Sequence, residues 1–171
     1  MDMVTRIERT QQMGGEFLTW LWYRADLNEG VLQVGDRPVE VWFDAKLALE
    51  SLGAIKEQNV IRSETPTETE EARASLQSGK HVREAQLRLI CDQKAWALTL
   101  RGEDLSMHGV KIPALLTSEA DDRLYERLAL LEEVEGLVDG LFQEFARVRL
   151  DDDAWRSEVE AIRDWIHPAR N

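Results

Sequence analysis

The chain is most apolar between residues 14 and 30, where glycines at both ends enclose about four helical turns. The apolar side chains there are nearly continuous: Phe17, Leu18, Trp20, Leu21, Trp22 and Tyr23. This pattern predicts a helix over residues 15–26 that is buried on more than one side. One small sheet does not cover so wide an apolar surface, so we expect Phe17, Trp20, Trp22 and Tyr23 to form a homodimer interface.

Alternation of apolar and polar residues predicts two antiparallel hairpins. The first spans residues 31–43 and turns at residues 35–38, where the sequence is Gly-Asp-Arg-Pro. The second spans residues 84–100 and turns at residues 91–94. Residues 59–62 have the composition of a further strand.

A short helix is expected over residues 67–78. The segment Thr65-Pro66-Thr67-Glu68 combines a capping threonine, a proline at the first helical position and a glutamate that completes a capping box. A competing box begins at Thr67, and Gly79 supplies the left-handed residue that ends the helix. The apolar stretch at residues 46–52 fits neither period clearly.

Beyond residue 117 the pattern becomes that of long helices. Ser118 with Asp121 resembles a capping box. The apolar residues that follow recur at steps of three and four: Leu124, Leu128, Leu131, Val134, Val138, Leu141, Phe142, Phe145 and Val148. Three aspartates at residues 151–153 interrupt this helix and start a second one, whose apolar face carries Trp155, Val159, Ile162 and Ile166. A helical hairpin over residues 118–166 is therefore expected.

Together these elements predict an α+β fold, in which covering helices pack on an antiparallel sheet of hairpins and a C-terminal helical hairpin packs on that body. We expect an α+β domain over residues 1–117 and an acidic helical hairpin over residues 118–171. No apolar run approaches the length of a membrane span, and the first ten residues lack the apolar centre of a secretion signal. We therefore expect a cytoplasmic protein.

Charge argues against a free-standing nucleic-acid binder. The chain has 21 Lys and Arg against 33 Asp and Glu, a formal net charge of −12. Proteins that bind phosphate backbones usually carry a basic surplus. The helical end contributes most of the negative charge, since residues 118–171 have 7 basic and 15 acidic side chains and therefore a net charge of −8.

The sequence favours a protein that is not an enzyme. His81, His108 and His167 are far apart, so they do not have the spacing of metal ligands, and no cofactor is indicated. Phosphate-binding loops and known nucleophile motifs do not occur. Cys91, the only cysteine, falls on the apolar face of a strand and fits a buried structural role.

The aromatic segment has a second interpretation. Trp20, Trp22 and Tyr23 could stack on bases, as aromatic side chains do in single-strand binders. That function requires interleaved basic residues, and only Arg24 is adjacent. Packing in the core or at a subunit interface is therefore favoured.

Residues 14–105 resemble the C-terminal part of RdgC, a family of bacterial recombination-associated proteins. The resemblance consists of the segment GGEFLTWLWY, the strand Asn59-Val60-Ile61-Arg62 after a leucine-rich stretch, the helix start Thr69-Glu70-Glu71, the sequence Ser78-Gly79-Lys80, and two strands of which the second carries an aromatic. It implies a non-enzymatic, dimeric protein that binds duplex DNA without reading its sequence and restrains a recombinase-type partner.

If DNA is bound, we expect the contacts in the segments that carry this resemblance. The basic residues there are Arg62, Lys80, His81, Arg83, Arg88 and Lys94. Arg88 alternates with Leu87 and Leu89, so its side chain should point to solvent. The alternative is an acidic protein-interaction module that acts on a DNA-handling partner and does not bind DNA itself.

Overall fold

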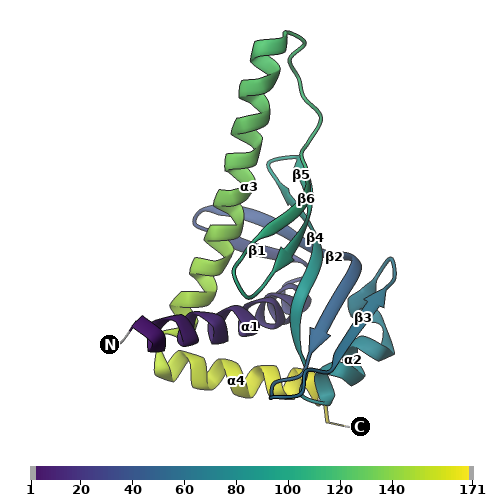
Figure 1. The fold of residues 1–171 in the computed structure, drawn as a ribbon, viewed down its shortest axis with the longest axis vertical. Coiled ribbons are helices and arrows are strands. Elements are labelled where there is room, and N and C mark those ends of the chain that lie inside the picture. The colour runs from purple at the N-terminus through teal and green to yellow at the C-terminus, as the bar shows by residue number, and fades with distance from the viewer. Residues whose placement is uncertain (1–2, 170–171) are drawn as a thin grey trace.

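The computed structural model describes the backbone of residues 3–169 and the side chains of residues 13–169. The strands are β1 (Val31–Val34), β2 (Arg37–Glu50), β3 (Gln58–Arg62), β4 (His81–Cys91), β5 (Lys94–Arg101) and β6 (Met107–Lys111). The helices are α1 (Met3–Leu27), α2 (Glu70–Gln77), α3 (Ala120–Arg149) and α4 (Asp152–Ile166), with a short 3₁₀ turn, η1, at Pro66–Glu68. Their arrangement is shown in Figure 1.

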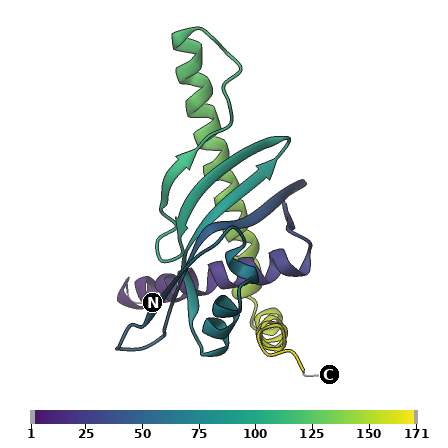
Figure 2. The same cartoon turned by 90° about the vertical axis from the view of Figure 1, so that its right-hand side faces the viewer.

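The six strands form one antiparallel sheet in the order β1-β2-β4-β5-β6. The long strand β2 has two partners on its other edge, because β1 pairs with its first half and β3 with its second. Helices α1 and α3 pack on one face of this sheet (Figure 2). The predicted α+β fold with an antiparallel sheet is thus confirmed.

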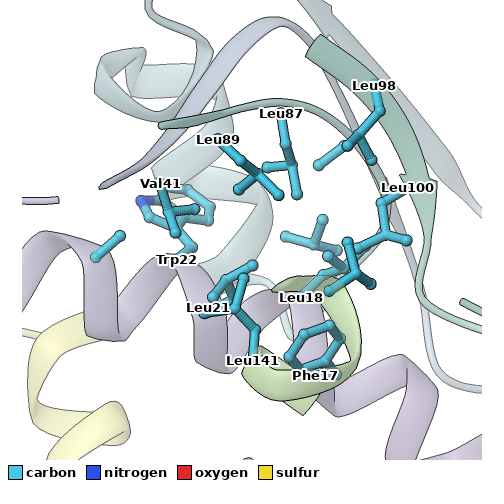
Figure 3. Close-up of a cluster of buried hydrophobic side chains, with 14 of the residues drawn as sticks. Phe17, Leu18, Leu21, Trp22, Val41, Leu87, Leu89, Leu98, Leu100 and Leu141 are labelled. Carbon is cyan, nitrogen blue, oxygen red and sulfur yellow. The ribbon is translucent and has the colours of Figure 1, made fainter. Parts of the chain in front are cut away.

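The core lies between the sheet and these helices. Side chains from α1, α3 and the strands form one buried cluster, part of which is shown in Figure 3. Phe17, Trp20, Trp22 and Tyr23 all belong to the buried set, with exposed fractions of 0–7%. The premise that this aromatic face is left uncovered is therefore wrong, since α3, α4 and the sheet enclose it within one chain.

Helix α1 begins earlier than predicted. It runs through Gly14 and Gly15 without interruption and starts at Met3. Residue 14 has to be glycine because the helix crosses the end of β5 there. A Cβ atom at this position would collide with the carbonyl oxygen of Gly102. Gly14 thus marks a close approach of two backbones within the helix rather than the beginning of the helix.

Both hairpins form as predicted, the second with its turn at the expected residues and the first with a turn one residue earlier than expected. Val34 pairs with Arg37, so only Gly35 and Asp36 form the first turn and the following strand begins two residues earlier than expected. In the second hairpin Cys91 pairs with Lys94 across a two-residue turn. The ambiguous stretch at residues 46–52 largely continues β2, which runs to Glu50 and pairs there with β3.

The start of α2 differs from both predicted capping boxes. Residues 66–68 form only a 3₁₀ turn, and the α-helix begins at Glu70. Thr69 is the N-cap, and its hydroxyl accepts a hydrogen bond from the backbone N–H of Ala72. The predicted end is confirmed, because Gly79 has φ of +92° and the N–H of Lys80 bonds to the carbonyl of Ser75.

Two local expectations after residue 102 are wrong. The segment from Gly102 to Pro113, which the sequence pattern predicts to be a loop, contains β6, which pairs with β5. Its high content of His, Gly and Lys hid the strand from propensity arguments. Ser118 does not cap α3, which begins at Ala120 after Glu119 and has no side-chain cap. The predicted Asp151 cap of α4 is confirmed, since its carboxylate accepts from the N–H of Ala154.

The C-terminal helical pair packs on the body through α3 and α4. The second half of α3 contributes Val134, Leu137, Leu141 and Phe145 to the shared core. Its first turns, together with the segment before it, extend beyond the sheet (Figure 1). We call residues 112–129 the arm. Leu116, Leu124, Tyr125 and Leu128 are exposed on it, by 49–95%.

Candidate nucleic-acid interface

The two faces of the sheet differ in composition. On the helix side, alternate residues of β4 and β5 such as Leu87, Leu89, Trp96 and Leu98 are buried almost completely. The residues between them point the other way and are exposed or half-buried. Among residues 3–169 no helix covers this second face, which we call the open face (Figure 2).

The open face gathers positive side chains from five strands. Arg62 of β3 is paired directly with Lys46 of β2. Arg88 in the centre of β4 is flanked by Trp42 of β2 and Ala97 of β5. The face also carries Arg101 at the end of β5, opposite Glu84, and Lys111 of β6, opposite Ala97.

Glu84 joins two of these cations across three strands. Its carboxylate accepts hydrogen bonds from Lys46 Nζ at 2.7 Å and from Arg101 Nε at 3.2 Å. The hydrogen bond from Lys46 is the main reason that the pKa of Glu84 lies below its usual value, and Arg101 adds to it. Lys46 and Arg101 are therefore held in place by the carboxylate between them.

Trp42 adds an aromatic surface beside Arg88. Its side chain is 44% exposed, and its indole N–H donates to Glu40 at 3.2 Å. A large exposed aromatic next to an arginine is a combination that can contact a sugar, a base or a phosphate backbone. The carboxylates of Glu40 and Glu84 lie on the same face and partly offset its positive charge.

The predicted DNA-contacting residues do not form one cluster. Arg62 and Arg88 lie on the open face, and Arg88 is exposed as predicted. Lys80 lies at the N-terminal end of β4, where its Nζ donates to Asn59 of β3 at 2.5 Å. Arg83 approaches Glu50 at 4.0 Å near the same end.

Lys94 and His81 are also separated from the open face. Lys94 Nζ bonds to Glu133 of α3 at 3.0 Å, so it holds the hairpin tip to a helix on the other side of the sheet. His81 is half-buried beneath α1, beside Gly15, and its buried Nδ1 has no hydrogen-bond partner among the described residues. Of the six basic residues considered, the structure brings only Arg62 and Arg88 to the same surface.

Sequence reasoning missed Lys46, Trp42, Arg101 and Lys111 as members of this surface. Arg101 continues the outward alternation of Ala97 and Thr99, a signal that was available in the sequence. Lys46 follows an irregularity in β2, where the pairing shifts between Phe43 and Leu47 and Ala45 has φ of +49°. The period of two is broken there, so the outward direction of Lys46 required the structure.

Other chemistry has less support in the described residues. Among the side chains of residues 13–169, no three His, Cys, Asp or Glu come together as a metal site. Burial is the main reason that the pKa of the Cys91 thiol is raised, which disfavours the reactive thiolate. No helix in the described part of the chain is long and apolar enough to cross a membrane.

No protein-family model matches the chain, and a comparison with curated proteins also finds no match. The resemblance to RdgC therefore rests on the residues quoted for it above. Beyond those residues, function has to be inferred from the surfaces that the fold presents.

Proposed function

We propose that the protein binds duplex DNA without reading its sequence, through the open face of the sheet. The observation that carries this proposal is that Arg62, Lys46, Arg88, Arg101 and Lys111 share one face that no described helix covers. The proposal agrees with the RdgC resemblance, which implies a non-enzymatic, recombination-associated role in the cytoplasm.

The arrangement favours backbone contacts over base readout. The cations come from separate strands and spread over the width of the sheet, so they suit a row of phosphates. Within residues 3–169, no helix projects from the open face to enter a major groove. Binding of this kind is mainly electrostatic, so its affinity falls steeply as salt rises.

The test is fluorescence anisotropy with two unrelated duplexes and one single strand, first at about 20 mM salt and then at rising salt. The variant Arg62→Gln with Arg88→Gln removes two exposed cations that hold no described carboxylate within 4.0 Å. Its matched control is Arg147→Gln with Arg156→Gln, which removes two exposed cations from the helices.

We expect similar affinity for both duplexes, a few-fold weaker binding for each arginine removed from the open face, and little change in the control. Equal weakening in both variants would show that only net charge matters, and would contradict the assignment to the open face. No duplex binding by the wild-type protein at low salt would contradict the proposal altogether.

We also propose a homodimer, formed through the arm rather than through the aromatic residues of α1. Leu116, Leu124, Tyr125 and Leu128 are exposed together, and contiguous apolar surfaces of this kind are typical of interaction sites. The same exposed arm favours the second candidate function, a module that binds a recombinase-type or other DNA-handling protein. That alternative would be favoured if duplex DNA is not bound at low salt and if a purified recombinase binds the wild-type protein but not an arm variant.

A further inference from the structure

A cavity of about 360 Å³ opens where α1 ends against the edge of β2. Pairing with β1 stops at Glu40, and pairing with β3 starts at Lys46, so residues 41–45 have no strand beside them on this edge. The end of α1 and the segment around η1 form the other walls. The lining of the cavity includes Trp22, Asp26, Glu29, Trp42, Phe43 and Glu68.

The floor of this cavity contains a buried hydrogen-bond donor without an acceptor. Trp22 is 1% exposed, and its indole Nε1 has no hydrogen-bond partner among the described residues. Figure 3 shows this nitrogen beside Val41, on the side of the ring away from Leu100 and the centre of the core. Buried N–H groups are nearly always paired, so this one calls for an acceptor supplied from the cavity.

The walls are aromatic and the rim is acidic. Trp42 and Phe43 are partly exposed and face the cavity with Trp22. Asp26, Glu29 and Glu68 contribute three carboxylates, whereas no Lys or Arg lines it. Asp26 already accepts from the Trp165 indole at 2.9 Å, but Glu29 and Glu68 form no ion pair with any described side chain.

We propose that this cavity binds an organic cation that also carries a carbonyl oxygen, as an arginine or lysine residue does. Aromatic faces attract guanidinium and ammonium groups, and the two unpaired carboxylates add charge attraction at the entrance. The carbonyl oxygen accepts the Trp22 N–H. A phosphate or carboxylate ligand is disfavoured by the same carboxylates, so this site selects a different ligand from the open face, with which it shares Trp42.

The cation can come from a basic protein segment or from a free small molecule. Nuclear magnetic resonance of the ¹⁵N-labelled protein distinguishes them, because each tryptophan indole N–H gives its own signal and Trp22→Phe assigns the relevant one. The probes are N-acetyl-arginine methylamide, its neutral citrulline counterpart, and a short acetylated Gly-Arg-Gly peptide. The full chain is titrated with each probe separately.

We expect saturable shifts of the Trp22 and Trp42 indole signals with the arginine compound and much weaker shifts with the citrulline compound. Tighter binding of the peptide identifies a protein segment as the better source, and equal binding identifies the free cation as sufficient. Both results support the site. Unchanged indole signals, or equal shifts with the charged and the neutral compound, overturn it.

A pair of variants tests the carboxylates. Glu29→Gln with Glu68→Gln should weaken binding of the arginine compound by about two- to fivefold for each carboxylate removed. Glu132→Gln with Glu135→Gln removes the same charge from exposed positions on α3 and should leave this affinity unchanged. Equal weakening in both variants overturns the assignment. Duplex binding through Arg62 and Arg88 is measured separately, so failure of one proposal leaves the other testable.

Discussion

Gly14 of α1 lies so close to Gly102, the residue after β5, that neither position has room for a side chain. A Cβ atom on Gly102 would lie 2.5 Å from the carbonyl oxygen of Gly14, and one on Gly14 would collide with the carbonyl of Gly102. The Gly102 N–H also bonds to the carbonyl of Arg83 at 2.9 Å, which holds this backbone in place. The contact determines how closely α1 crosses the end of the sheet.

We expect Gly14→Ala to destabilise the protein by about 1–3 kcal/mol or more, since the methyl group forces two backbones apart. Gly136→Ala is the matched control, because Gly136 is an exposed residue of α3 with open space around it. That variant should gain about 0.5–1 kcal/mol from its better helix propensity. Urea unfolding measures both. A neutral Gly14→Ala variant would mean that the crossing is looser than described.

The start of α2 provides a second test of the structure. Thr69→Ala removes the hydroxyl that accepts the Ala72 N–H, and should lower the free energy of unfolding by about 1 kcal/mol. Thr65→Ala alters the threonine that the sequence pattern predicts to be the N-cap. The structure shows no capping hydrogen bond to that side chain. It should therefore change stability by much less. If thermal or urea unfolding showed a larger loss of stability in Thr65→Ala than in Thr69→Ala, the helix start predicted from the sequence would be the right one.

The strands of the second hairpin and their buried faces could be predicted because local alternation coincides with packing in β4 and β5. The helix boundaries could not, for reasons that lie outside each segment. Gly14 and Gly15 look like a helix end, yet the first of them is required by a contact with Gly102, which is distant in the sequence. The capping rule favoured Thr65 or Thr67 because the Thr-Pro-Thr-Glu segment fits it, although the helix begins after Thr69, in the Thr69-Glu70-Glu71 segment named in the resemblance.

The candidate site was less accessible to sequence reasoning than the fold. Grouping basic residues by their position along the chain placed Lys94 beside Arg88, although the structure pairs Lys94 with Glu133 of α3. Lys46 and Arg62 are 16 positions apart and become neighbours only when β2 pairs with β3. Strand pairing and the irregularity in β2 decide which cations share a face, and neither was encoded in a local pattern.

His81 makes stability depend on pH. Burial is the main reason that its pKa lies below the usual value, although Glu50 and Glu16 oppose the shift. The unfolded chain therefore binds a proton more readily than the folded protein as pH falls below about 6.5. The free energy of unfolding should decrease between about pH 7 and pH 5, and less so in His81→Gln. His108→Gln, at an exposed residue, is the control and should keep the wild-type slope.

The arm predicts the oligomeric state. Light scattering at micromolar concentration should give twice the chain mass of 19.7 kDa. Leu124→Glu with Leu128→Glu should give the monomer with an unchanged circular dichroism spectrum, because both side chains are about half exposed. Leu150→Glu alters an exposed leucine outside the arm and should leave the dimer intact. A wild-type monomer, or a dimer that survives the double substitution, would contradict this interface.

The acidic helical residues 118–171 should weaken duplex binding only through long-range electrostatic repulsion of the DNA. Glu132 and Asp139 are exposed on α3, which packs on the opposite side of the sheet from the open face. Glu133 lies between them on the same helix but accepts hydrogen bonds from Arg37 and Lys94. It is therefore unsuitable for this test, since its removal would leave two cations without their partner.

A helix about 10 Å thick and the sheet itself separate these carboxylates from DNA bound on the open face. That distance exceeds the screening length of about 8 Å at physiological salt, whereas at 10 mM salt the screening length grows to about 30 Å. Glu132→Gln with Asp139→Asn should thus strengthen duplex binding at about 10 mM salt and have no effect at about 150 mM. Anisotropy titrations at both salt concentrations measure this difference. An equal gain at both would mean that DNA passes beside α3, and the open face would no longer explain its binding.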